Sequence, residues 1–262
     1  MRTILLLLFL LSINAVAQHP LVGTWHMITA KGIGADGEGF FLDTTSVRET
    51  KIITPTHYML IAWDVENDSL IFNRTMGGRV RIEGKKYIET PTQASVQIFD
   101  NVNADFEWKR DGEIFTQSGT IVRPDGKKVI LEALIFQRET DAATMQAKKS
   151  IQGAWTQVTD VRKSTGINSP SSNESVASLL ILTPTHWMRM THKNQKFDGV
   201  MYGGYSPSGG ETLGRVIYST YPMKTGDHVR FAEDGNGALE FTWNRETAKG
   251  PETFTDRFAK AR

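Results

Sequence analysis

Cysteine is absent from the 262 residues of this chain. That absence excludes disulfides, thiol nucleophiles, iron–sulfur clusters and zinc sites built on cysteine. An excess of one charge is missing as well, because 30 Lys and Arg oppose 29 Asp and Glu and leave a formal net charge of +1. A balanced chain has no overall electrostatic attraction to nucleic acid or to an acidic membrane surface. We therefore expect neither of these partners.

Long apolar runs are also missing, apart from one close to the N-terminus. Arg2 precedes the apolar run 4–11, and Ala15, Val16 and Ala17 then form a small-residue site. The run is much shorter than the roughly 20 residues that span a bilayer, which argues against integral membrane association. A positive residue, an apolar stretch and small residues in this order are typical of a secretory signal. We expect residues 1–17 to be a signal peptide and the mature protein to be periplasmic or secreted.

What the sequence does contain is an internal repeat. The block LVGTW (21–25) recurs as IQGAW (151–155), and IITPTHYM (52–59) recurs as ILTPTHWM (181–188), each about 130 residues later. A third block, MGG (76–78), recurs as MYGG (201–204) in the same order. Repeated blocks at a nearly constant offset indicate a duplicated structural unit. The sequence predicts two domains, residues 19–139 and 150–262.

Within each copy the pattern is that of short β-strands. Alternating apolar segments are separated by turn signals such as Gly84, DG (111–112) and PDG (124–126), at about ten-residue spacing. An antiparallel barrel is favoured because closing the sheet removes its edges. Residues 139–149 contain good helix formers and no Gly or Pro. The predicted fold class is all-β, with two tandem antiparallel barrels joined by a short helical linker.

The Gly-x-Trp motifs at 23–25 and 153–155 resemble the signature that opens the barrel of lipocalins and the wider calycin superfamily. The TPTH blocks are similar to those of lipocalin-like domains in exported Bacteroidetes proteins. The resemblance implies that Trp25 and Trp155 close the base of each barrel. It also implies that a basic residue after the last strand packs across each indole, a role for Arg138 in the first copy and for Lys260 or Arg262 in the second.

An alternating stripe follows each TPT turn. In the second copy His186, Met188, Met190 and His192 share one face of the expected strand, and Trp187, Arg189 and Thr191 share the other. The polar Arg189 and Thr191 indicate an outward face, so the histidine–methionine face is predicted to point into the barrel. This stripe either lines a ligand cavity or fills a closed core. With two tyrosines of a predicted mouth loop, the candidate ligand-binding residues are His57, Met59, Trp63, His186, Met188, Met190, His192, Tyr202 and Tyr205.

Two residues are candidates for acid–base catalysis, and the catalytic residues are otherwise unknown. Glu132 lies in the apolar run 129–136, where alternation predicts an inward carboxylate with a raised pKa. The alternative is an ordinary edge or rim residue bonded to a nearby arginine. His186, like His57, directly follows a turn, which fits either catalysis or a structural bond to that turn.

Neither a metal nor a cofactor is expected. His186 and His192 are six residues apart, ~20 Å along a strand, too far to share one ion. No phosphate loop, dinucleotide fingerprint or nucleophile elbow occurs in the sequence.

The predicted function is that of an exported lipocalin-like protein binding a small hydrophobic or amphipathic molecule in a barrel cavity. The alternative is an acid–base enzyme (an isomerase, lyase or hydrolase) acting on a metabolite or glycan at a barrel mouth. A third possibility is an interaction protein with filled barrels. A cavity wall with one charged pair would favour the enzyme, and a wholly apolar wall the carrier. The sequence leaves the oligomeric state and the choice of active copy open.

Overall fold

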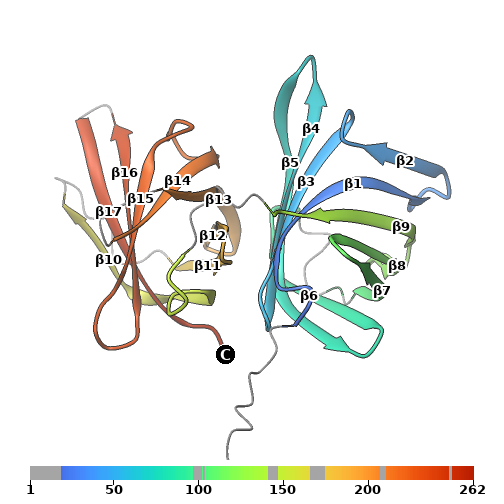
Figure 1. Ribbon diagram of the computed structural model, residues 1–262. Coiled ribbons are helices and arrows are strands. Elements are labelled where there is room, and N and C mark those ends of the chain that lie inside the picture. The colour runs from blue at the N-terminus through green and yellow to red at the C-terminus, as the bar shows by residue number, and fades with distance from the viewer. Residues whose placement is uncertain are drawn as a thin grey trace, which may run out of the picture.

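The computed structural model describes residues 19–96, 102, 104–140, 147–165, 175–206, 211–247 and 250–262. The predicted signal peptide lies outside these residues, as does the central part of the predicted helical linker, 141–146. The described residues that follow, 147–152, form turns and irregular backbone. The described chain is all-β and contains no helix. It forms two barrels that lie side by side (Figure 1).

The first barrel, barrel 1, is built from a nine-stranded sheet. Its strands are β1 (Gly23–Ile33), β2 (Gly39–Asp43), β3 (Val47–Ile53), β4 (His57–Glu66), β5 (Ser69–Glu83), β6 (Lys86–Ala94), β7 (Ala104–Asp111), β8 (Ile114–Val122) and β9 (Lys128–Arg138). Strands β2 and β3 pair with successive stretches of β1 and share one place in the ring. Pairing of β1 with β9 closes the barrel.

The second barrel, barrel 2, repeats this arrangement. Its strands are β10 (Gly153–Thr165), β11 (Val176–Leu182), β12 (His186–Lys193), β13 (Lys196–Ser206), β14 (Thr212–Ser219), β15 (His228–Glu233), β16 (Leu239–Thr247) and β17 (Gly250–Lys260). Each strand pairs antiparallel with the next, and β10 pairs with β17 to close the ring. The predicted all-β class with two tandem antiparallel barrels is confirmed.

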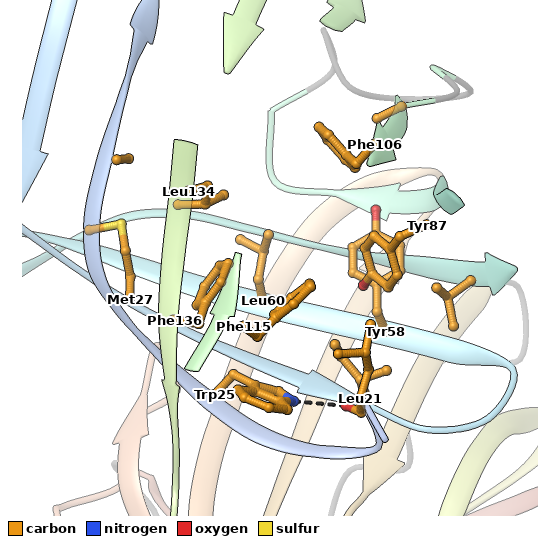
Figure 2. Packing of buried hydrophobic residues seen from close by; sticks show 14 of the residues in the cluster. Leu21, Trp25, Met27, Tyr58, Leu60, Tyr87, Phe106, Phe115, Leu134 and Phe136 are labelled. Carbon is orange, nitrogen blue, oxygen red and sulfur yellow. Dashed lines mark hydrogen bonds between the residues drawn. The ribbon is translucent and has the colours of Figure 1, made fainter. Parts of the chain in front are cut away.

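Each barrel carries a buried tryptophan at the start of its first strand. The Trp25 indole N–H donates to the carbonyl of Leu21 at 2.8 Å, the bond drawn in Figure 2. Trp155 donates in the same way to the carbonyl of Ile151, also at 2.8 Å. A buried indole N–H needs an acceptor, and in both copies the turn entering the barrel supplies it.

A cation lies against each of these rings. The Arg138 guanidinium carbon is 5.8 Å from the centre of the Trp25 ring, and the Lys260 ammonium is 4.1 Å from that of Trp155. Of the two basic residues considered for the second copy, Lys260 holds this place. Arg262 instead lines a surface groove on barrel 1. An ammonium over indole contributes about 0.5–2 kcal/mol.

A hydrophobic cluster joins the two barrels through equivalent strands. Strand β4 contacts β11 and β3 contacts β12, which are the same contacts with the copies exchanged. Phe72 stacks on Phe197, its counterpart in the repeat, with ring centres 5.8 Å apart and planes 5° apart. Reciprocal contacts of this kind define an isologous interface. The two copies therefore pack like the subunits of a dimer with approximate two-fold symmetry (Figure 1).

Candidate functional site

The histidine–methionine stripe lies between the barrels. Met59, Met188 and Met190 are fully buried in the cluster that joins the two copies, together with Trp63 and Tyr202. The prediction that this stripe points into a barrel was wrong. Its repeated pattern reflects the interface, because both copies present the same face to each other.

That prediction assumed that the polar residues Arg189 and Thr191 face solvent, and this assumption was wrong. The Arg189 guanidinium is fully buried inside barrel 2, where it forms an ion pair with Asp256 at 2.8 Å. Thr191 is also fully buried and bonds to Ser178 at 3.0 Å. Polar side chains can occupy an interior when their partners are buried with them. The polar character of this face therefore did not indicate solvent.

The two repeated histidines bond to their own turns. The His57 backbone N–H donates to the Thr54 hydroxyl at 3.0 Å, and its ring Nδ1 lies 2.9 Å from the Thr56 hydroxyl. His186 makes the same two bonds with the matching threonines, both at 3.1 Å. Of the two roles left open by the sequence, these contacts are those of the structural one.

His186 is held neutral within the interface. Its ring stacks on Tyr202 at 5.4 Å and lies edge-on to His26 at 6.1 Å. Burial, helped by the nearby His26 and opposed by Glu139, lowers the pKa of His186 to about 4. The ring is only 6% exposed. A residue enclosed in this way has no access to a substrate at a barrel mouth.

The remaining stripe and tyrosine residues also lie away from any mouth loop. The ring Nε2 of His192 is 2.9 Å from the carbonyl of Ala94 in the other barrel. Tyr202 and Tyr205 belong to β13, and the Tyr205 hydroxyl donates inside barrel 2 to the carbonyl of Thr183 at 3.2 Å. The predicted loop contained these tyrosines, but the described chain is a buried strand through residue 206.

Glu132 points to the outside of barrel 1, so the expected inward carboxylate was wrong. Its side chain is 51% exposed and pairs with Lys31 at 3.1 Å. Register shifts in both neighbouring strand pairs interrupt the alternation of β9 here, so that Leu131 and Leu134 both line the interior. A β-bulge reverses the facing of all later residues in a strand. The alternative, a carboxylate outside the interior and bonded to an arginine, gave the correct side of the sheet, but the partner is Lys31.

An apolar cavity of about 380 Å³ occupies barrel 1. Its walls come from strands all around the barrel and include Met27, Ala30, Phe40, Leu60, Ile121 and Leu134. Cavities that bind small molecules are commonly ~300–1,000 Å³, mostly apolar, with a few polar groups that fix the ligand's orientation. The size and lining of this cavity match that description.

A buried ion pair forms part of the cavity wall. Lys51 donates to Glu89 at 2.7 Å and to the Gln117 side-chain oxygen at 3.1 Å. Lys51 is 1% exposed, and its ammonium lies 5.1 Å from the centre of the Phe136 ring. In the sheet register Lys51 is opposite Trp25. Lys51 therefore forms a floor between the cavity and the aromatic base of the barrel, and we call Lys51, Glu89 and Gln117 the cavity floor.

Two tyrosines lie beneath this floor, close to each other in Figure 2. Burial raises the pKa of Tyr58 and of Tyr87 well above the ordinary value, and the negative charge of Glu89 raises both further. The two phenols are therefore neutral, and the Lys51 ammonium lies 5.9 and 5.8 Å from their ring centres.

Glu49 supplies the second carboxylate of the cavity wall. It lies two residues before Lys51 in β3, on the same face and farther from the Trp25 base. Its Oε2 accepts from the Arg74 guanidinium at 2.9 Å. No described group lies within hydrogen-bonding distance of its Oε1, although Glu49 is only 5% exposed. This oxygen is an acceptor without a partner in the wall of an apolar cavity.

Sequence reasoning missed these residues, although the repeat contained a signal. Aligning the two TPTH blocks places Lys51 opposite Leu180 and Glu49 opposite Ser178. A charged residue in one copy, at a position where the other copy has an apolar or small one, marks an interior that has diverged. Comparing the copies position by position could have identified β3 as the strand that carries the site.

Among the described residues, no three His, Asp or Glu side chains converge closely enough to hold a metal ion. No helix in the described ranges could serve as a membrane span.

No protein-family model matches the chain, and no curated protein is similar to it. The function is therefore inferred from the geometry of the cavity.

Proposed function

We propose that barrel 1 binds a small hydrophobic or amphipathic molecule in its cavity and that the protein is a carrier. The observation that carries the proposal is the 380 Å³ apolar cavity with its buried charged floor. Burying a ligand's apolar surface supplies ~25 cal/mol per Å², and the few polar groups of the wall would orient it.

The second barrel has a different interior, which supports barrel 1 as the active copy. Trp187 packs against Phe231 and Phe241 with ring centres 5.7 and 5.8 Å apart. Phe231 and Phe241 are in turn 5.3 Å apart. These rings pack on one another in the interior of barrel 2, as the side chains of small barrels usually do. For barrel 2 we propose a structural role in which it docks on β3, β4 and β5.

Filling the cavity tests the carrier role. Ala30 lines the cavity, so Ala30→Phe would place a ring in the ligand's space. Ala177→Phe makes the same change at an exposed position of β11 and serves as the control. The measurements are mass spectrometry of molecules extracted from purified protein and the rise in Tm with 1-octanol, octanoate, octylamine and 2-octanone. A bound ligand raises Tm by mass action.

We expect a lipophilic molecule or a Tm rise with the wild type and with Ala177→Phe, and neither with Ala30→Phe. Equal binding by both variants would show that the ligand binds outside the cavity of barrel 1. If the wild type yields no lipophilic molecule and no probe raises its Tm, the carrier proposal fails.

A second candidate function is acid–base chemistry centred on Glu49. The unpartnered Oε1 in an apolar cavity favours it, because a general base needs a free oxygen within reach of its substrate. A charged pair in the wall was expected to favour an enzyme, and the wall holds two such pairs. Carriage is nevertheless the better-supported function, because the charges of these pairs bind each other and the described wall holds no histidine or hydroxyl group to act with Glu49.

Deuterium exchange separates these two functions. A base in the cavity would exchange activated C–H protons of a bound molecule in D2O, and Glu49→Gln would abolish that exchange. For a carrier we expect the extracted molecules to be recovered without deuterium on carbon. Exchange that depends on Glu49 would establish the enzyme instead.

We also propose that the carrier is exported to a periplasmic or extracellular location. The support is the signal-like pattern of residues 1–17. N-terminal sequencing of the mature protein after cell fractionation tests this. We expect the mature chain to begin at Gln18, and recovery of intact residues 1–17 from the cytoplasm would contradict export.

A further inference from the structure

The polar groups of the cavity wall restrict which class of molecule it can hold. We propose that the barrel 1 cavity selects an uncharged apolar molecule with one hydrogen-bond donor, an alcohol or a primary amide, whose O–H or N–H binds Glu49 Oε1. This inference rests on the proposed carrier function and adds the chemistry of the ligand's polar end.

The free oxygen of Glu49 requires a donor. An ionised carboxylate can only accept hydrogen bonds. Its Oε2 is already bound to Arg74, whereas Oε1 has no partner among the described residues. Leaving a buried acceptor unsatisfied is costly, and hydrogen bonds to charged groups are among the stronger ones in proteins. A ligand that donates to Oε1 would remove this cost on binding.

Within the cavity floor, the Lys51 ammonium makes no demand for a ligand acceptor. The Lys51 ammonium already donates to both Glu89 and Gln117, and its remaining surface faces the Phe136 ring. Its hydrogen bonds are therefore directed at protein groups. A ligand that only accepts, such as a ketone, would exclude water from Glu49 Oε1 without offering this oxygen a donor.

The balance of charge requires the ligand to be neutral. Among the residues that the structure describes, the ionisable side chains lining the cavity are two carboxylates, Glu49 and Glu89, and two cations, Lys51 and Arg74. Each carboxylate is paired with one of the cations. A fatty-acid carboxylate would bring a further acceptor and an uncompensated charge into a largely apolar space. An alkylammonium would donate to Glu49 but would also add an unpaired charge there.

Four probes with the same eight-carbon chain test the inference. They are 1-octanol (donor and acceptor, neutral), 2-octanone (acceptor only), octanoate (charged acceptor) and octylammonium (charged donor). Isothermal titration calorimetry of the full chain measures their affinities. We expect 1-octanol to bind about tenfold more tightly than 2-octanone, as the gain of one hydrogen bond to a charged group implies. We also expect it to bind more tightly than either ion.

The variant Glu49→Gln sharpens the test. Because Arg74 needs an acceptor, the Gln side-chain oxygen should face it and the amide NH2 should face the cavity. The acceptor in the wall then becomes a donor, and the preference for 1-octanol over 2-octanone should disappear. Glu132→Gln makes the same change on the outer surface of the same barrel and should leave the preference intact.

One comparison requires no variant at all. Wild-type protein should bind 1-octanol about tenfold more tightly than its methyl ether, which has the same oxygen but no donor. This measurement decides the question even if Glu49→Gln fails to fold.

The outcomes separate this inference from the carrier function. If no eight-carbon probe binds the wild type, and Ala30→Phe changes nothing, the carrier function itself fails. If Ala30→Phe abolishes binding but 2-octanone, the ether or octanoate binds as tightly as 1-octanol, the cavity is real and the donor inference is overturned. A preference for 1-octanol that survives in Glu49→Gln also overturns it, because another group then makes the contact.

Discussion

The two barrels share the turn, the tryptophan base and, apart from the extra strand β2 of barrel 1, the strand order, yet their interiors differ. Barrel 2 packs rings such as Trp187 and Phe241, 5.8 Å apart, against each other in its interior, whereas barrel 1 has a 380 Å³ cavity. The residues that the copies share lie in the turns, at the base and on the face where the barrels meet. Duplication has therefore kept what holds the pair together, and the inward positions have diverged.

Both interiors bury an ion pair, but in different surroundings. In barrel 2 the Arg189 guanidinium lies 5.1 Å from the Phe241 ring and pairs with a fully buried Asp256. In barrel 1 the pair of Lys51 and Glu89 borders the cavity. The first environment is closed by aromatic rings, and the second offers space in which water or a ligand can reach the charges.

The largest effect should come from breaking the pair in barrel 2. Arg189→Met leaves the Asp256 carboxylate buried without its cation, which typically costs about 3–5 kcal/mol. Lys51→Met should cost less, because water in the cavity can hydrate Glu89. Urea denaturation gives the free energy of unfolding of both variants, and an equal or reversed order would contradict the difference between the interiors.

Replacing both charges in barrel 2 provides the control for this prediction. The double variant Arg189→Met with Asp256→Leu removes the uncompensated carboxylate. It should recover most of the stability lost in Arg189→Met, because apolar replacement of a whole buried pair is often neutral. A double variant as unstable as the single one would show that packing, and not charge, causes the loss.

Truncation of apolar side chains should produce the next largest contrast. Phe241→Ala in the filled barrel removes a ring with close neighbours and should cost about 3–4 kcal/mol. Leu134→Ala enlarges an existing cavity in barrel 1 and should cost about 2 kcal/mol, near the low end for such changes. Thermal and urea unfolding measure both. If Leu134→Ala costs as much as Phe241→Ala, barrel 1 is packed as tightly as barrel 2.

Acid should lower the free energy of unfolding, because His186 is buried where the barrels meet. The pKa of this ring is about 4 in the folded protein and near 6.5 in the unfolded chain. Between these values the unfolded chain binds more protons, so the free energy of unfolding falls as the pH falls from 6.5 towards 4. The full shift corresponds to about 3 kcal/mol. Above pH 6.5 the ring is neutral in both states and has no effect.

The comparison that isolates this effect uses two histidine variants. His186→Gln should lose less stability than the wild type between pH 6.5 and 4.5 in urea denaturation. His228→Gln, at an exposed histidine of barrel 2, should follow the wild-type curve. Parallel curves for all three proteins would show that acid lability has another source.

The fold was largely predictable because its signals are repeated. Gly-x-Trp and TPTH occur in both copies at the same offset, and the short alternating segments are typical of a barrel. The sequence was a poorer guide to which side chains of each strand point into the barrel. The presence of Arg189 in a strand indicates an outer face on average, and only the partner Asp256 on β17, far along the chain, makes an inner position possible.

The site was harder to predict than the fold for the same physical reason. A β-bulge at Glu132 leaves no mark in the residue types, yet it moves the carboxylate from the inside to the outside. Glu49 and Lys51 look like exposed residues of an edge strand until their cations, carboxylates and amides from β5, β6 and β8 are placed beside them. Long-range pairing decides these positions, and one sequence does not display it.

The smallest contrast lies at the bases of the barrels, in the glycines of the Gly-x-Trp motifs. Gly23 has φ of 146° and Gly153 has φ of 125°, both of which disfavour a side chain. A Cβ at Gly153 would lie 3.0 Å from the Lys260 ammonium, whereas one at Gly23 would lie 3.4 Å from the nearest Arg138 atom. The closer cation over Trp155 leaves less room at its glycine.

We therefore expect Gly153→Ala to destabilise the protein by about 1–2 kcal/mol, and Gly23→Ala by somewhat less. Thermal unfolding measures the two losses. Gly112→Ala, at a turn where a Cβ meets nothing within 4 Å, provides the control for backbone strain alone, since its φ of 56° is also positive. If Gly153→Ala costs no more stability than Gly112→Ala, the positive φ alone accounts for the glycine of the motif. Contact with the cation would then not explain why glycine precedes each basal tryptophan by two residues.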